Sequence, residues 1–153
     1  MNESNADDEQ WMRHALNLAE QARDQDEVPV GAVVVDHDTL IGEGFNTPIS
    51  KHDASAHAEI QAIRQACLYK QNYRLPDSTL YVTLEPCTMC AGAIVHARIA
   101  RVVIAAKEPR AGAAGSVFNI LQNESLNHHC LVEFGLLADV SSNLLKTFFK
   151  ARR

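Results

Sequence analysis

The hydrophobic positions of the chain follow two different spacings. Near both ends, apolar residues recur every three or four positions, which is typical of one face of a helix. Between these ends, short continuous apolar runs alternate with polar turns, which is typical of buried strands. We therefore predict an N-terminal and a C-terminal helix, whose inward residues are Trp11, Ala15, Leu18 and Ala22 beside Met12, Leu16 and Ala19, and Val140, Leu144, Leu145, Phe148 and Phe149.

Five short apolar runs are predicted to be strands, and the turn at Asp36-His37-Asp38 joins the first two into a hairpin. The runs cover residues 30–35, 40–45, 80–84, 102–105 and 131–134. A further helix is expected to begin at Ser55-Ala56 and to turn Ile60, Ile63 and Cys67 inward. Strands that alternate with helices after a hairpin predict an α/β fold, a three-layer α/β/α sandwich with a central mixed sheet of about five strands.

Length and composition are those of one globular domain. The chain has 153 residues, 46% of them hydrophobic, and it shows no repeat or linker. We therefore expect a single domain over 1–153, in which residues 1–8 form a flexible acidic tail. No run approaches a membrane span, and the first residues lack the features of a signal peptide, so we expect a cytoplasmic protein with no membrane partner.

Charge is distributed unevenly along the chain, whose formal net charge is −5. Residues 1–97 carry six Lys or Arg and fifteen Asp or Glu, whereas residues 98–153 carry eight and four. The net sign argues against a nucleic-acid partner, but the second half leaves room for a basic patch; ordinary surface cations explain the same charges equally well. The patch would consist of Arg98, Arg101, Lys107, Arg110, Lys146, Lys150, Arg152 and Arg153.

Two short motifs carry the candidate chemistry. His57-Ala58-Glu59 supplies one imidazole, and Pro86-Cys87-Thr88-Met89-Cys90 supplies two thiolates. Pro86 suits the first position of a helix, which places Cys87 and Cys90 on one helix face. Structural zinc sites have four protein ligands, so three ligands leave a position for water. Glu59 is better placed to move the protons of that water than to bind the metal.

Each motif alone has another interpretation. A Cys-x-x-Cys pair after a strand is also typical of a dithiol redox protein or a structural metal site. His57 alone suits a hydrogen-bonded helix end, and Glu59 alone suits a solvated first turn. Their joint spacing favours a catalytic zinc site. The remaining cysteines, Cys67 and Cys130, are expected to be buried apolar residues in a reducing cytoplasm.

With these motifs, the chain closely resembles the bacterial tRNA-specific adenosine deaminases of the zinc-dependent cytidine deaminase-like superfamily. The resemblance runs from about Trp11 to Arg153. The zinc motifs identify only the superfamily, and flanking blocks point to the tRNA-acting branch. These blocks are Glu27-Val28-Pro29-Val30-Gly31-Ala32, Ile41-Gly42-Glu43-Gly44-Phe45-Asn46, Asn72-Tyr73-Arg74-Leu75, Leu80-Tyr81-Val82-Thr83-Leu84-Glu85-Pro86 and Gly112-Ala113-Ala114-Gly115-Ser116.

The resemblance implies hydrolysis of adenosine to inosine at the wobble position of a tRNA, expected to be an arginine tRNA with anticodon ACG. One Zn²⁺ per subunit, held by His57, Cys87 and Cys90, would present hydroxide to C6 of a flipped-out adenine. Glu59 would carry the proton of the water to N1 and then assist the departure of ammonia.

The resemblance also implies a nucleoside pocket. Asn46 would hydrogen-bond the bound nucleoside, although a turn before Pro48 explains this asparagine as well. Backbone groups near Gly31, Ala58 and Glu85 would line the purine site, where glycine permits close approach. The side chain of Glu85 also suits the start of a helix.

The implied RNA contacts are His52, Asp53, Glu108, Phe149 and Arg152. Glu108 occupies a place where the family usually carries aspartate, and Ala111 a place where threonine is common. A carboxylate here could accept a hydrogen bond from a ribose 2′-OH, the group that distinguishes RNA from DNA. A solvated loop explains His52 and Asp53 equally well, and core packing explains at least one of the terminal phenylalanines.

Members of the family are homodimers, so we expect a homodimer that binds a tRNA anticodon stem-loop and uses no organic cofactor. The small apolar helix at 91–95 suits packing against a partner or inside the core. One alternative is a zinc-dependent deaminase of free guanine, cytosine or cytidine, against which the flanking blocks argue. Another is a noncatalytic zinc or RNA-binding module, against which Glu59 beside an open metal position argues.

Overall fold

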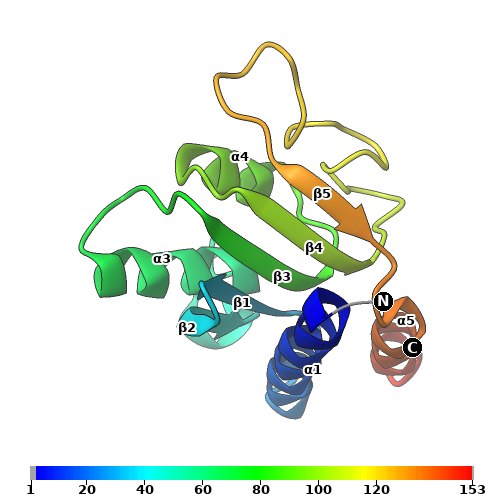
Figure 1. Ribbon diagram of the computed structural model, residues 1–153. Coiled ribbons are helices and arrows are strands. Elements are labelled where there is room, and N and C mark those ends of the chain that lie inside the picture. The colour runs from blue at the N-terminus through cyan, green and yellow to red at the C-terminus, as the bar shows by residue number, and fades with distance from the viewer. Residues whose placement is uncertain (1–2, 153) are drawn as a thin grey trace.

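A mixed five-stranded sheet forms the centre of the computed structural model, which describes residues 3–152 (Figure 1). The strands, in the spatial order β2-β1-β3-β4-β5, are β1 (Gly31–Asp36), β2 (Thr39–Phe45), β3 (Ser78–Leu84), β4 (Arg101–Ala106) and β5 (Leu131–Phe134). Strand β1 pairs antiparallel with β2 and β3, whereas β3, β4 and β5 are parallel. The predicted hairpin and mixed sheet are confirmed.

Helices cover both faces of this sheet. Helices α1 (Glu3–Asp24) and α5 (Ala138–Lys150) lie on one face, and α3 (Ala58–Lys70) and α4 (Thr88–His96) lie on the other (Figure 1). The short helix α2 (Pro48–Lys51) lies in the connection between β2 and α3. This arrangement is the predicted three-layer α/β/α sandwich. Within residues 3–152, no helix is long and apolar enough to cross a membrane.

Helix α3 packs closely on β2 because the facing residues are small. A Cβ atom at Gly42 would lie 2.2 Å from the carbonyl oxygen of Ala62, so a larger residue does not fit there. The helix buries mainly alanines and Ile63, whereas Ile60 and Cys67 are only partly buried. The prediction is confirmed for Ile63, which belongs to the core, and for Cys67, which packs against it, whereas Ile60 is only partly buried and does neither.

Helix α5 buries a narrower stripe than its sequence predicts. Phe148 and Ser141 are buried, and Ser141 Oγ donates a hydrogen bond to the carbonyl oxygen of Thr83. Val140 and Phe149 are 46% and 47% exposed, so the predicted stripe was wrong at these two positions. Only one edge of the helix contacts the sheet, which leaves both side chains facing outward.

The N-terminal segment also differs from its prediction. Helix α1 begins at Glu3, so the expected flexible tail over 1–8 is helical from that residue. Asp8 is buried, and its carboxylate accepts hydrogen bonds from Tyr81 Oη at 2.6 Å and from Arg101 Nη2 at 2.6 Å. These charge-assisted contacts offset the cost of burying the carboxylate and hold the start of the helix on the sheet.

Candidate metal centre and substrate pocket

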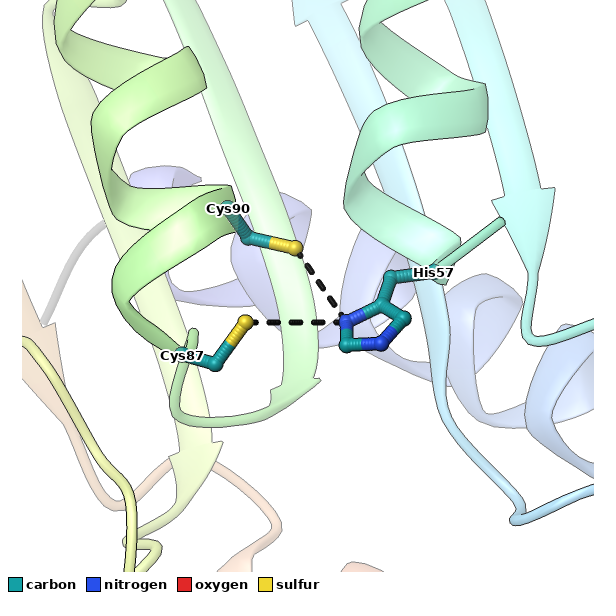
Figure 2. Close-up of side chains that lie close together, drawn as sticks. All are labelled: His57, Cys87 and Cys90. Atoms are coloured by element: carbon teal, nitrogen blue, oxygen red, sulfur yellow. Dashed lines mark hydrogen bonds between the residues drawn. The ribbon is translucent and has the colours of Figure 1, made fainter. Parts of the chain in front are cut away.

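Two helices begin side by side at the end of the sheet where β3 finishes, and they bring three metal-binding side chains together (Figure 2). His57 is the N-cap residue of α3, Cys87 is the N-cap residue of α4, and Cys90 lies one turn into α4. The side chain of His57 makes no cap hydrogen bond with α3. The imidazole and the thiols point toward one another instead, as Figure 2 shows.

Both helices begin later than the sequence predicted. Helix α3 starts at Ala58 rather than at Ser55, and α4 starts at Thr88 rather than at Pro86. The extended backbone of His57 and of Cys87 aims these side chains across the gap between the two helix ends, which a helical conformation would not do. Each helix therefore starts directly after a residue whose side chain belongs to the metal-binding group.

The spacing of the three donor atoms fits zinc. Nδ1 of His57 lies 3.6 Å from Sγ of Cys87 and 3.5 Å from Sγ of Cys90. Ordinary Zn–N and Zn–S bonds at tetrahedral angles separate a nitrogen and a sulfur ligand by about 3.6 Å. Thiolates together with imidazole also favour zinc over oxygen-seeking cations such as magnesium. With three protein donors, one position of a tetrahedron remains for water or substrate.

Glu59 lies beside this donor set in the first turn of α3 and is 4% exposed. Burial raises the pKa of its carboxyl group to about 7, so the group can both accept and donate a proton near neutral pH. A hydrogen bond from Cys90 lowers the pKa of Cys87 to about 3, and the hydrogen bond with Cys87 raises the pKa of His57. The carboxyl group of Glu59 can therefore transfer protons beside the metal-binding residues.

A cavity of about 190 Å³ opens beside the metal ligands. Its apolar walls come from the segment before β1 and from the end of β3, and its polar groups come from the start of α3 and from the connections that follow β2, β3 and β4. Sequence reasoning missed the apolar walls, because these residues read as ordinary strand positions. The lining consists of Val28, Val30, Asn46, His57, Glu59, Leu84, Glu85, Cys87, Glu108 and Ala111.

Asn46 connects this pocket to the metal helix. Its side chain is 9% exposed, and Oδ1 accepts a hydrogen bond from the backbone N–H of Ala58 at 3.1 Å. Its own backbone N–H donates to the carbonyl oxygen of Val30 at 3.1 Å. With Oδ1 engaged, the side-chain amide group Nδ2 is the part of Asn46 that is available to a ligand.

Gly31 follows Val30, which lines the pocket, and its missing side chain has a packing role. A Cβ atom on this residue would lie 1.9 Å from the carbonyl oxygen of Ala15 in α1. Its N–H donates to Oγ1 of Thr83 in β3. The glycine therefore permits close packing of α1 on the sheet.

Glu85 lines the pocket, but its carboxylate points into the loop that follows β4. It accepts hydrogen bonds from the backbone N–H groups of Glu108, Ala114 and Ser116. These bonds lower the pKa of its carboxyl group, although burial acts in the opposite direction and is the largest single influence. Sequence reasoning assigned only its backbone to the pocket and missed this role of the side chain.

A second buried glutamate lies one residue before Val28, which lines the pocket, and the sequence analysis quoted it only as part of a flanking block. Glu27 is 1% exposed, and its two carboxylate oxygens accept hydrogen bonds from the N–H groups of Ile49 and Ser50 in α2, at 3.2 and 2.7 Å. The N-cap residue of this helix, Thr47, makes no side-chain cap. Glu27 therefore satisfies the first N–H groups of α2 from another segment of the chain.

The residues expected to contact RNA come from three places: the segment after α2, the loop after β4 and the C-terminal end of the chain. His52 is exposed in a left-handed conformation at the end of α2, and Asp53 accepts hydrogen bonds from the N–H and the hydroxyl group of Ser55. Oε1 of Glu108 accepts a hydrogen bond from the N–H of Arg110. Of this group, only Glu108 lines the pocket.

The C-terminal arginine makes intramolecular contacts. Nη2 of Arg152 donates to Oδ1 of Asp26 at 2.7 Å, and the guanidinium group lies 3.7 Å from the centre of the Phe148 ring. Phe149 is exposed beside it. Arg153, which the sequence analysis also placed in a basic patch, lies outside the described residues.

Two other members of that patch are far from the pocket. Arg101 pairs with Asp8 and Glu133, and Arg98 donates to the carbonyl oxygen of Val95. Arg98 lies just before β4 and Arg101 is its first residue, and the strand spans roughly 17 Å before the loop that reaches the pocket. The length of β4 therefore separates Arg98 and Arg101 from Lys107 and Arg110, so these four cations do not form one continuous patch.

The family model of the cytidine and deoxycytidylate deaminase zinc-binding region matches residues 5–106 of this chain. This range contains His57, Glu59, Cys87 and Cys90. The fold, the donor set and the buried glutamate together define a zinc-dependent deaminase.

Similar proteins indicate which family of zinc-dependent deaminases this chain belongs to. A tRNA-specific adenosine deaminase of Haemophilus influenzae is 52% identical over 147 residues, which cover 95% of this chain and 85% of the relative. A structure from studies of A-to-I editing by tRNA:A34 deaminases at the wobble position of transfer RNA has a TM-score of 0.86 and 42% identity, covering 89% of this chain and 99% of that one. A guanine deaminase of Nitrosomonas europaea has a TM-score of 0.79 and 27% identity, covering 92% and 83%. The chain belongs to the tRNA-specific adenosine deaminase family of zinc-dependent hydrolases.

Proposed function

We propose that the chain converts adenosine to inosine and ammonia at the wobble position of an arginine tRNA with anticodon ACG. The observation that carries the proposal is the grouping of His57, Cys87, Cys90 and Glu59 around one pocket with apolar walls. The relative of 52% identity supports tRNA as the substrate, and the structural relative from work on wobble-position editing supports the position.

His57, Cys87 and Cys90 would hold one zinc ion per subunit. Zinc at such a site supplies a Lewis acid that makes water nucleophilic near neutral pH. Glu59 accepts the proton that this water releases as oxygen bonds to C6 of the adenine, and it delivers that proton to N1. Glu59 would then take the proton of the new C6 hydroxyl group and pass it to the amino group, which leaves as ammonia as the C6–N6 bond breaks and the C6 carbonyl forms. A pKa of about 7 suits both directions of transfer.

The pocket would receive a base that has left the anticodon stack. Val28, Val30 and Leu84 offer apolar surface to the faces of a purine. Nδ2 of Asn46 would donate a hydrogen bond to the nucleoside, because Oδ1 is already bonded to the N–H of Ala58. Glu108 at the pocket wall would accept a hydrogen bond from a ribose hydroxyl group of the RNA.

Contacts with the rest of the anticodon loop would come from exposed residues. His52 and Asp53 follow α2, next to the segment that carries Asn46. Phe149, 47% exposed, offers a ring on which a base can stack, and Arg152 beside it offers a cation to a phosphate. Binding through Arg152 would exchange its ion pair with Asp26, which costs little because Asp26 is 90% exposed.

A homodimer in the cytoplasm is part of the proposal. Helix α4 buries Ala91, Ile94 and Val95 in the core, while a Cβ atom at Gly92 would meet open space, so its outer side leaves room for a neighbour. Helix α3, which contacts α4, exposes Leu68 on its outer side. The residues that follow Leu68 add further exposed apolar surface. Sedimentation analysis of the wild type and of Leu68→Glu tests this face: a wild-type dimer that becomes monomeric in the variant supports it, and a variant that remains dimeric contradicts it.

The decisive experiment is an assay of inosine formation in an arginine tRNA transcript with anticodon ACG. Free adenosine, cytidine and guanine are tested in parallel, and Glu59→Ala serves as the inactive control. Conversion confined to the wobble adenosine supports the proposal. Turnover of guanine or cytidine instead would keep the zinc chemistry and overturn the assignment of tRNA.

A further inference from the structure

The loop after β4, residues 107–116, is organised around one buried carboxylate. Glu85 is 3% exposed and accepts hydrogen bonds from the backbone N–H groups of Glu108, Ala114 and Ser116, at 3.0, 3.0 and 3.1 Å. The hydroxyl group of Ser116 donates a fourth hydrogen bond to the same carboxylate. All four donors belong to this loop, so one side chain from the end of β3 determines the course of the loop.

We propose that Glu85 is a positioning residue that sets affinity for the RNA substrate by holding loop 107–116 against the metal-binding segment. The loop supplies Glu108 and Ala111 to the pocket, and Glu85 precedes Cys87 by two residues. Glu85 thus links the wall that faces the substrate to the segment that binds the metal. The kinetic part of this inference rests on the proposed function, whereas its structural part does not.

Two further contacts join the loop to the same segment. The N–H of Ala113 donates to the carbonyl oxygen of Pro86 at 2.8 Å. A Cβ atom at Gly112 would lie 2.4 Å from Cδ of Glu85 and 2.6 Å from the carbonyl oxygen of Glu108. Glycine is therefore required at residue 112 as long as the carboxylate of Glu85 occupies the centre of the loop.

The arrangement requires a carboxylate at residue 85. A carboxylate has only acceptor sites, and here they face three N–H groups and one O–H group. A glutamine would turn its NH₂ group toward some of these donors and leave N–H groups without partners, which is costly when they are buried. Aspartate would retain the charge but withdraw it from the loop by one methylene group.

The first test is hydrogen–deuterium exchange on the zinc-loaded enzyme without substrate. In Glu85→Gln, the amides of Glu108, Ala114 and Ser116 are expected to exchange at least about tenfold faster, which corresponds to the loss of a single charge-assisted hydrogen bond. Amides in β4 and α1 are expected to keep their wild-type rates. Unchanged exchange in the loop would overturn the structural part of the inference, whatever the substrate of the enzyme.

The second test is steady-state kinetics on an anticodon stem-loop, after zinc content has been matched. Glu85→Gln is expected to raise KM about tenfold with kcat within about twofold of wild type, because Glu59 and the metal ligands remain in place. Ser116→Ala, which removes one of the four donors, is expected to raise KM less, and Glu85→Asp is expected not to restore it. Glu20→Gln, an exposed carboxylate on α1, is the matched control.

The outcomes separate the possible roles of Glu85. A fall in kcat with KM unchanged would mean that Glu85 acts in the chemical step, and it would overturn the inference. Equal losses in kcat and in zinc content would mean that it supports the metal site instead, which also overturns it. A wild-type enzyme that is inactive on the stem-loop would contradict the proposed function alone, since the exchange experiment tests the loop independently.

Discussion

Oδ1 of Asn46 lies 3.1 Å from the backbone nitrogen of Ala58 and accepts its hydrogen bond. Ala58 is the first residue of α3 and follows the metal ligand His57 directly. Its N–H is one of the helix-end donors that have no partner within the helix. Asn46 therefore accepts a hydrogen bond at the start of α3, as an N-cap side chain normally does. This bond connects the wall of the pocket to the helix that follows His57.

Asn46→Ala is expected to weaken both functions of this residue. Loss of the hydrogen bond to Ala58 leaves a buried N–H group without a partner, which should lower the free energy of unfolding by about 1–3 kcal/mol. Loss of Nδ2 should raise KM for the RNA substrate. Thermal unfolding and steady-state kinetics measure the two effects, and Asn46→Asp separates them because it keeps the acceptor and removes the amide donor. A KM for Asn46→Asp equal to that of the wild type would contradict a contact with the nucleoside.

Glu59→Ala is expected to abolish turnover and to keep zinc bound. Removal of a general acid–base group typically lowers rates by about 10²–10⁴-fold. The three donors to zinc do not include Glu59, so metal analysis should still find about one zinc ion per chain. The isosteric Glu59→Gln is the control for the volume of this buried side chain. Loss of zinc from both variants would show that Glu59 supports the metal site.

Cys87→Ala is expected to lose zinc and to unfold at a lower temperature, because binding of the metal stabilises the folded state in which its ligands meet. Cys67→Ala is the matched control, since Cys67 is also a free cysteine on a helix but lies outside the donor group. Zinc analysis and thermal unfolding with and without a chelator provide the measurements. A variant lacking Cys87 that retains both zinc and activity would refute the ligand assignment.

The metal site could be predicted from the sequence because its information is local. His57 and Glu59 are two residues apart, Cys87 and Cys90 are three apart, and each pair lies at one helix start. The alternation of strands and helices similarly predicted the three layers. These patterns depend on neighbours in the chain, which a sequence displays directly.

The roles of several polar residues could not be predicted because their partners are distant in the chain. Glu85 bonds residues that follow it by 23 to 31 positions, and Asp8 bonds Tyr81 and Arg101, which are 73 and 93 positions away. An acidic residue near a terminus looks solvated until the fold shows its partners. The packing role of Gly31 was missed for the same reason, because the helix that crosses it comes from another part of the chain.

Asp8, Tyr81 and Arg101 form such a long-range group at the end of the sheet opposite the metal. Burial raises the pKa of Asp8, but hydrogen bonds from Arg101 and Tyr81 and the charge of Arg101 outweigh it, so the pKa lies below its ordinary value of 3.8. A carboxyl group whose pKa is lower in the folded state stabilises the fold above its unfolded pKa. This contribution is lost as the pH falls through the folded value.

Asp8→Asn is therefore expected to lower the free energy of unfolding at pH 7 by about 1–3 kcal/mol, since it leaves the guanidinium group of Arg101 with fewer charged partners. The difference from the wild type should shrink as the pH falls below about 3.8, where Asp8 of the unfolded chain becomes protonated, and disappear below the lower folded-state pKa. Asp7→Asn is the matched control, because Asp7 is exposed and next to it in the chain. Urea unfolding at several pH values measures the difference in unfolding free energy between variant and wild type. Because both proteins have the same metal ligands, effects of acid on those ligands cancel in this difference. A difference that persists unchanged at pH 3 would mean that Asp8 stabilises the helix by packing and not by its charge.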